Sequence, residues 1–126
     1  MIDQVQDLVV LTVAYHSQES LEELSSHLYR QTCQPDKWLV VNNSPESAGA
    51  LKLIAKCPIL TIEGQEGDGF SKGCNRGLVA LQAEQWSGWV WILNPDITFL
   101  DCKTIEKLKL KLAGMPSTAL LGTAVE

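Results

Sequence analysis

Hydrophobic residues in this chain occur in short runs, separated by stretches in which apolar residues recur at helical spacing. Four runs rich in β-branched or aromatic residues predict buried strands, at 8–15, 37–42, 59–62 and 89–93. After the first run, Leu21, Leu24 and Leu28 repeat with helical period. This spacing predicts a helix that starts at Ser17, a favourable N-cap residue, and ends near Gln31.

Three further helices are expected, at 50–56, 71–84 and 102–113. The first must stop before Pro58, because the residue before a proline avoids helical geometry. The inward face of the second is expected to hold Phe70, Cys74, Gly77, Leu78 and Leu81.

The helix at 102–113 is expected to be capped by Asp101. Its apolar face would consist of Ile105, Leu108 and Leu112, and its lysines are expected in water, at positions 103, 107, 109 and 111. Such a run is typical of a solvated face rather than of a lipid-binding surface. The apolar segment 119–125 predicts a fifth strand.

The alternation of strands and helices predicts an α/β domain with a doubly wound, mainly parallel sheet. Right-handed crossovers make 3-2-1-4 the natural strand order. The chain reverses direction between the first and the fourth strand, and ligands bind at such reversals beyond the carboxyl ends of the strands. Among the aromatic residues, Trp89 and Trp91 are expected to fill the core, and Trp38 and Trp86 to pack at its margins.

Composition narrows the classes of function. The chain has 126 residues, 45% hydrophobic and 20% charged, which fits one soluble globular domain. Its formal net charge of -5 argues against a nucleic-acid partner. The four cysteines form no C-x-x-C pair and predict reduced thiols rather than a zinc site. The sequence shows neither a signal peptide nor an apolar run long enough to span a membrane, so a cytoplasmic location is expected.

Polar residues follow three of the predicted strands directly. They are Tyr15-His16, Asn42-Asn43 and, on the two sides of Pro95, Asn94 and Asp96; a glycine-rich segment, 63–70, follows the remaining strand. Pro95 makes the turn at Asn94 rigid. The carboxylate of Asp96 suits a divalent cation, and the paired amides suit the edge of a nucleobase.

The helix at 71–84 begins with positive side chains, where cations oppose the helix dipole. Lys72, Asn75 and Arg76 share one face of its first turns. A docked anion would remove this conflict. The alternative is a pair of solvated surface cations.

These segments, in this order, resemble the nucleotide-sugar binding half of family-two inverting glycosyltransferases, particularly rhamnosyltransferase-like members. The matching pieces are Val-Val-Leu-Thr-Val-Ala-Tyr-His-Ser at 9–17, Leu-Val-Val-Asn-Asn-Ser at 39–44, Gly-Phe-Ser-Lys-Gly-Cys-Asn-Arg-Gly at 69–77 and Trp-Ile-Leu-Asn-Pro-Asp at 91–96. The resemblance implies a Rossmann-like nucleotide-diphospho-sugar transferase fold. It covers nearly the whole chain.

The resemblance also implies roles for individual residues. Tyr15 and Asn42 would flank the base, and Asp96 would bind Mg²⁺ or Mn²⁺ as part of a D-x-D type motif. The ribose or diphosphate would lie near Lys72, Asn75 and Arg76. The full set of substrate-binding candidates is Tyr15, His16, Asn42, Asn43, Gly69, Phe70, Lys72, Asn75, Arg76 and Asn94.

Two positions depart from the family pattern, because Asn42 and Asn94 stand where acidic residues are usual. The second change is frequent in rhamnosyltransferase-like relatives and favours a deoxythymidine-diphosphate sugar such as the rhamnose donor. The implied reaction transfers the sugar, with inversion, to a saccharide or lipid-linked acceptor. The location would then be cytoplasmic, with peripheral attachment to the inner face of the membrane left open.

Residues 1–126 would form only the donor-binding domain, without the half that binds the acceptor and supplies the general base. The alternative is a non-catalytic nucleotide-binding or scaffold domain derived from the same fold. A nicotinamide-binding domain is disfavoured, because the glycines at 67, 69 and 73 follow the third predicted strand rather than the first. A receiver domain would need acidic residues where Tyr15-His16 stands. Self-association through an open sheet edge at the last strand is a further expectation.

Overall fold

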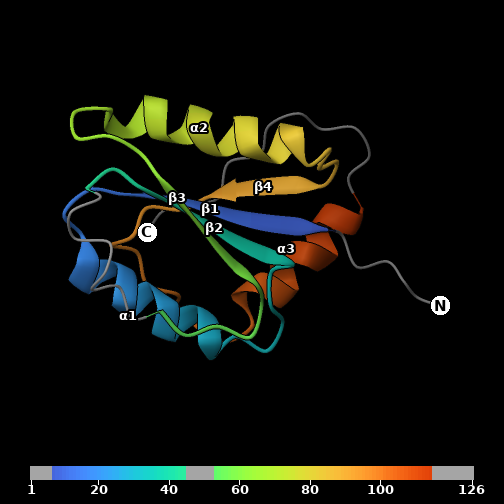
Figure 1. Cartoon of the computed structure of the whole chain (residues 1–126). Helices are drawn as coiled ribbons and strands as arrows, with labels where there is room; N and C mark the ends of the chain where they lie inside the picture. Colours follow the sequence, from blue (N-terminus) through green and yellow to red (C-terminus); the bar gives the residue numbers. More distant parts are fainter. Residues whose placement is uncertain (1–6, 45–52, 115–126) are drawn as a thin grey trace.

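The structure is a computed structural model that describes residues 7–44 and 53–114. Within these ranges, strands and helices alternate along the chain (Figure 1). The elements are β1 (Leu8–Ala14), α1 (Gln18–Tyr29), β2 (Lys37–Asn42), β3 (Ile59–Glu63), α2 (Gly69–Ala83), β4 (Trp89–Ile92) and α3 (Thr104–Ala113).

The four strands form one parallel sheet in the order β3-β2-β1-β4, as the sequence predicted. The helix α2 covers one face of the sheet, and α1 and α3 cover the other (Figure 1). Along β1, Val9, Leu11 and Val13 belong to the core under α2, whereas Leu8 and Val10 belong to the core under α1 and α3. A strand covered in this way must be apolar on both sides, which explains why Thr12 is its single polar residue.

The helix α2 packs against β1 through two glycines. A Cβ atom added to Gly73 would lie 2.6 Å from Val13 Cγ1, and one added to Gly77 would lie 2.5 Å from Leu11 Cδ1. The prediction that Cys74, Gly77 and Leu81 face inward is confirmed. It was wrong for Phe70 and Leu78, which are exposed, because the close approach at the glycines fixes the rotation of the helix.

Two predictions about the tryptophans were wrong. Trp38 is fully buried in the core rather than at its margin, because β2 has a neighbouring strand on each side. Its Nε1 atom donates a hydrogen bond to Thr12 Oγ1 at 3.1 Å. Trp89 and Trp91 pack against the core but stay only partly buried, because β4 is an edge strand of the sheet that the structure describes.

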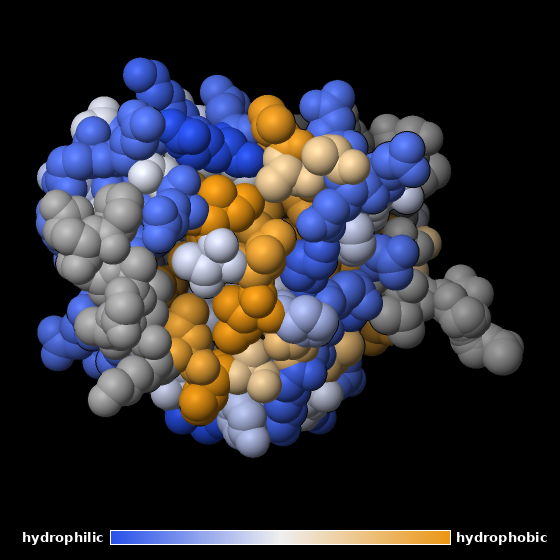
Figure 2. Space-filling view, viewed as in Figure 1, coloured by the Kyte–Doolittle hydropathy of each residue, from blue (hydrophilic) through white to orange (hydrophobic). Residues whose placement is uncertain are grey.

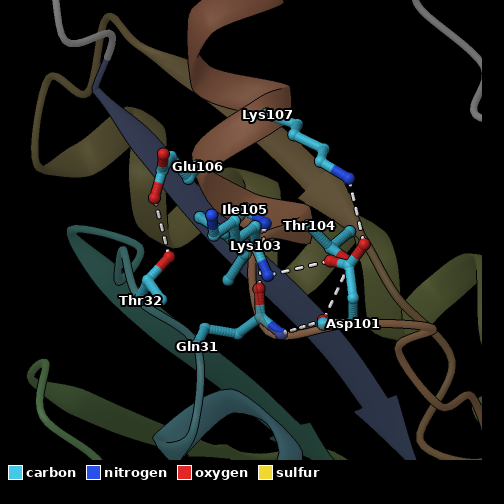
Figure 3. Close-up of polar contacts among 8 residues, drawn as sticks. All are labelled: Gln31, Thr32, Asp101, Lys103, Thr104, Ile105, Glu106 and Lys107. Carbon is cyan, nitrogen blue, oxygen red and sulfur yellow. Dashed lines mark hydrogen bonds and ion pairs between the residues drawn. The ribbon is translucent and has the colours of Figure 1, made fainter.

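The start of α3 is tied to the end of α1 (Figure 3). The helix begins at Thr104 rather than Cys102, and Asp101 Oδ1 accepts a hydrogen bond from the backbone N–H of Lys103 at 2.8 Å. The buried Gln31 side chain accepts a bond from the Ile105 N–H at 3.0 Å and donates one to the Asp101 carbonyl at 2.8 Å. A side chain from a distant segment therefore satisfies a free helix N-terminal donor.

Lys109 does not face water as the sequence predicted. Its side chain is buried, and its Nζ atom lies 3.7 Å from Asp36 Oδ2. The other lysines of this run, Lys103, Lys107 and Lys111, are exposed. The position of Lys109 in the helix did not reveal its burial, because its acidic partner, Asp36, precedes β2 and comes near only in the folded chain.

The predicted helix at 50–56 is wrong for the part that the structure describes, since 53–56 are not helical. The hydroxyl of Ser25 on α1 instead donates to the Ile54 carbonyl and accepts from its N–H, both at 2.6 Å. Residues 50–52 and the predicted strand at 119–125 lie outside the described residues. Among the described helices, none is long and apolar enough to cross a membrane.

Candidate functional site

A crevice of about 590 Å³ lies at the carboxyl ends of β1 and β4. The strand β1 pairs with β2 on one side and with β4 on the other, so this is the place where the chain changes direction. The lining residues are Val13, Tyr15, Ser17, Ser20, Asn43, Gly67, Gly69, Phe70, Asn94, Pro95 and Asp96. The structure therefore brings six predicted site residues together: Tyr15, Asn43, Gly69, Phe70, Asn94 and Asp96.

Two aromatic rings line the crevice and remain in water. Tyr15 is 55% exposed and Phe70 is 52% exposed. The Tyr15 ring is held in an edge-to-face contact with His16, at 4.3 Å between ring centroids. Exposed rings of this size bind flat apolar groups well, because covering them removes much apolar surface from water.

The glycine-rich loop before α2 contributes to the crevice through its backbone. Gly67 and Gly69 have φ of 89° and 76°, which other residues rarely adopt. Between them, Asp68 accepts hydrogen bonds from the Gln65 N–H at 3.1 Å and from Arg76 Nε at 2.7 Å. The hydrogen bond from the Arg76 guanidinium holds the pKa of the Asp68 carboxyl below its usual range.

Asn43 connects this loop to the end of β2. Its buried side chain donates from Nδ2 to the Gly69 carbonyl at 3.0 Å. Its Oδ1 atom is buried without a hydrogen-bond partner and occupies the space where a Cβ on residue 64 would stand, which explains Gly64. The predicted base-binding residue thus also holds the glycine loop in place.

Asn42 and His16 lie outside the crevice, in a separate cavity of about 230 Å³. The Oδ1 atom of Asn42 accepts hydrogen bonds from the N–H and the hydroxyl of Ser44, both at 3.1 Å. His16 adopts a left-handed backbone with φ of 48°, and its Nε2 atom lies 3.0 Å from Glu66 Oε2. Both side chains are thus engaged within the protein.

Lys72, Asn75 and Arg76 also lie outside the crevice. They line a separate groove of about 460 Å³, here called the α2 groove, together with Ile62, Val79 and Ala80. The reason is the seating of α2, because Gly73 and Gly77 face the sheet and turn these polar residues toward the β3 side.

Asp96, the predicted cation ligand, is exposed and lines the crevice together with Asn94. Among the described residues, no group of three or more His, Cys, Asp or Glu side chains lies close enough to hold a metal ion. Mg²⁺ often binds through one or two carboxylates, several waters and the phosphates of its ligand. A single carboxylate beside an amide fits this kind of site, in which the bound ligand completes the coordination.

Two serines of the crevice were not among the predicted site residues. Ser17 precedes α1 as predicted, but its hydroxyl bonds to the N–H and the carbonyl of Tyr15, each at 3.0 Å, instead of capping the helix. Ser20 lies three positions after Ser17, and residues at this spacing share one face of a helix. This spacing was the signal in the sequence that could have placed Ser20 at the crevice.

A scan against protein-family models, a search of curated proteins and a search of solved structures each gave no match for this chain.

Proposed function

We propose that the crevice binds a nucleotide-diphosphate sugar as its divalent-cation complex, and that the chain is the donor-binding part of an inverting glycosyltransferase. The observation that carries this proposal is the combination of two exposed aromatic rings with a single carboxylate, Asp96, at the reversal point of a parallel sheet. Sites for nucleotides commonly lie at this position in such sheets.

The aromatic part of the crevice supports a role in holding the base. The rings of Tyr15 and Phe70 offer stacking surface, and Asn43 is the polar residue of β2's end that lines the same space. Stacking between a base and an aromatic ring contributes about 1–3 kcal/mol and tolerates different bases. Stacking therefore does not distinguish thymine from uracil, and the binding experiment compares the two.

The charge of the crevice supports a requirement for a metal ion. Of the lining residues within 7–44 and 53–114, Asp96 is the only charged one, and none is a lysine or an arginine. A diphosphate brought directly beside this carboxylate would be repelled. A bridging Mg²⁺ or Mn²⁺ would remove the repulsion and, during transfer, would neutralise charge on the departing diphosphate.

The same lining favours a second candidate, a nucleotide-binding domain without transferase activity. Transfer with inversion needs a general base that removes the proton of the acceptor hydroxyl. Among the described residues that line the crevice, Asp96 is the only carboxylate, and the ring of His16 is bonded to Glu66 outside it. In the first candidate, the base and the binding site for a saccharide or lipid-linked acceptor would come from elsewhere.

Titration calorimetry tests the proposal. Deoxythymidine diphosphate and uridine diphosphate are titrated into the wild type, Asp96→Ala and Glu23→Ala, with and without Mn²⁺. Glu23 is exposed on α1 and does not line the crevice, so its variant is the matched control for loss of one negative charge. We expect binding that requires Mn²⁺, is weakened at least about tenfold by Asp96→Ala, and is unchanged by Glu23→Ala.

A melting scan checks the result independently. A ligand at about 100 times its dissociation constant should stabilise the fold by about 2.7 kcal/mol. Binding that persists without metal or in Asp96→Ala would contradict the proposed role of this carboxylate. Release of sugar from a deoxythymidine-diphosphate sugar in the presence of saccharide acceptors would favour the first candidate, whereas metal-dependent binding by itself is expected of both.

A further inference from the structure

The strand β3 lies at an edge of the sheet, and its outer side carries backbone groups that no described residue pairs. The N–H of Trp38 bonds to the Pro58 carbonyl at 2.9 Å, and the N–H of Gly64 bonds to the Asn42 carbonyl at 2.8 Å. Because bonding direction alternates along a strand, the even-numbered residues of this segment face β2. The N–H and carbonyl groups of 59, 61 and 63 therefore point away from the sheet.

The side chains of this edge are apolar and partly uncovered. Leu60 is 38% exposed, and Val79, which lines the α2 groove together with Ile62, is 63% exposed. Leu60 and Ile62 pair with the β2 residues of the core under α2, so both lie on the α2 side. Figure 2 shows apolar surface across the middle of the view, where Figure 1 has the strands between α2 and α1. A proline, Pro58, and a charged residue, Glu63, stand at the two ends of β3, but the four residues between them contain neither of these usual protections of an edge strand.

We propose that this edge pairs with the same edge of a second copy of the chain. The two β3 strands run antiparallel about a two-fold axis at Thr61, which joins the two four-stranded sheets into one. In this register Thr61 faces Thr61 of the other copy, and Ile59 faces Glu63. Each of these pairs has its free backbone groups directed at the other strand and can exchange two hydrogen bonds.

The edge is self-complementary, which favours a second copy of the chain as its partner. With Thr61 on the axis, Leu60 of each copy lies opposite Ile62 of the other in a non-hydrogen-bonded pair, where side chains approach most closely. Both pairs lie on the α2 side, so they extend the apolar floor of the α2 groove from one copy to the next.

The charge at the carboxyl end of β3 favours the antiparallel arrangement. Glu63 is exposed at this end of the strand. Antiparallel pairing keeps the Glu63 carboxylates of the two copies at opposite ends of the paired strands, whereas parallel pairing would place these like charges side by side. The crevice lies beyond β1 and β4, across β2 from this edge, so the proposed pairing leaves it open and does not depend on its ligand.

The test is the molar mass in solution, measured by sedimentation and light scattering from about 1 µM to about 1 mM protein. The variants are Thr61→Lys and Thr61→Glu, which place like charges face to face on the proposed axis. Thr61 is exposed, so both substitutions are compatible with the folded chain, which circular dichroism verifies. Leu110→Lys is the matched control, because it adds a charge at an exposed apolar residue of α3.

We expect the wild type and Leu110→Lys to reach the mass of two chains, and each Thr61 variant alone to remain at the mass of one. A mixture of Thr61→Lys with Thr61→Glu should regain the two-chain mass, because opposite charges then face each other on the axis. A folded wild type of one-chain mass throughout, or two-chain mass retained in Thr61→Lys, would overturn the proposal. Failure of the mixture to associate would also show that Thr61 does not lie on a two-fold axis, and would indicate a partner other than a second copy of the chain.

Discussion

The crevice and the α2 groove hold the two sets of polar residues that the sequence connected with one ligand, yet they are built in different ways. The polar residues of the crevice, such as Tyr15, Asn43 and Asp96, follow strands directly. Those of the α2 groove, such as Lys72 and Arg76, lie on a helix. Ends of parallel strands meet at one edge of a sheet whatever the details of packing, whereas the direction of a helical side chain depends on how the helix is rotated.

That rotation is set by two small residues rather than by the large apolar ones. Gly73 and Gly77 allow α2 to approach β1 so closely that added methyl groups would overlap Val13 and Leu11. The exposed position of Phe70 and the separation of Lys72 from the crevice follow from this contact. The difference teaches that a glycine pair spaced by one helical turn can indicate the buried face of a helix better than its leucines.

The largest expected effect comes from breaking this contact. Gly77→Leu forces a side chain into space occupied by Leu11 and should lower the free energy of unfolding by about 3 kcal/mol, measured by urea denaturation. Gly114→Ala is the control, because the nearest contact of a Cβ there is an ordinary one, with the Lys111 carbonyl oxygen at 3.7 Å. Equal stability of Gly77→Leu and the wild type would show that α2 is not seated as described.

An intermediate effect is expected on ligand binding, where the two regions should differ. Tyr15→Ala removes an aromatic wall of the crevice and should weaken Mn²⁺-dependent nucleotide binding about tenfold, by calorimetry. Lys72→Ala removes a cation that lies in the α2 groove and should change the affinity by less than about twofold. Tyr29→Ala, at an exposed tyrosine of α1, controls for the loss of a ring. A larger loss of affinity in Lys72→Ala than in Tyr15→Ala would show that the crevice and the α2 groove form one binding site.

The smallest effect concerns acid stability. The Arg76 hydrogen bond lowers the pKa of Asp68 in the folded protein, so this carboxylate stabilises the fold above its ordinary pKa, and the contribution is lost as the pH falls through the lowered value. Arg76→Gln should therefore reduce the drop in melting temperature below about pH 4. Lys107→Gln should do the same through Asp101, whose pKa is lowered by the Lys107 hydrogen bond.

The variants Arg76→Gln and Lys107→Gln should also differ in nucleotide binding. Arg76 is tied to the glycine loop of the crevice through Asp68, whereas Asp101 precedes α3 on the other side of the sheet. Weaker nucleotide binding is expected in Arg76→Gln and unchanged binding in Lys107→Gln. The opposite pattern would show that the loop does not depend on this ion pair.

The strand order and the crevice could be predicted from the sequence because both depend on local pattern and on chain topology. Apolar runs mark strands, helices between them impose parallel crossovers, and polar residues after β1, β2 and β4 then meet at one edge. What the crevice binds remains a proposal, since no pattern in the residues of its lining fixes a ligand.

The tertiary structure decided the features that depend on contacts between distant segments. The burial of Lys109 near Asp36, the inward position of Trp38 and the seating of α2 each require a partner far away in sequence. The engagement of Asn42 by Ser44 is local, yet it follows from the turn at the end of β2, which the residue types alone left open. The sequence by itself determined which segments form the sheet and at which edge the crevice lies, because periodicity and connectivity are properties of the chain. Which side chains reach that edge was decided only by packing, because a rotation of α2 against β1 moves its polar face from one groove to another.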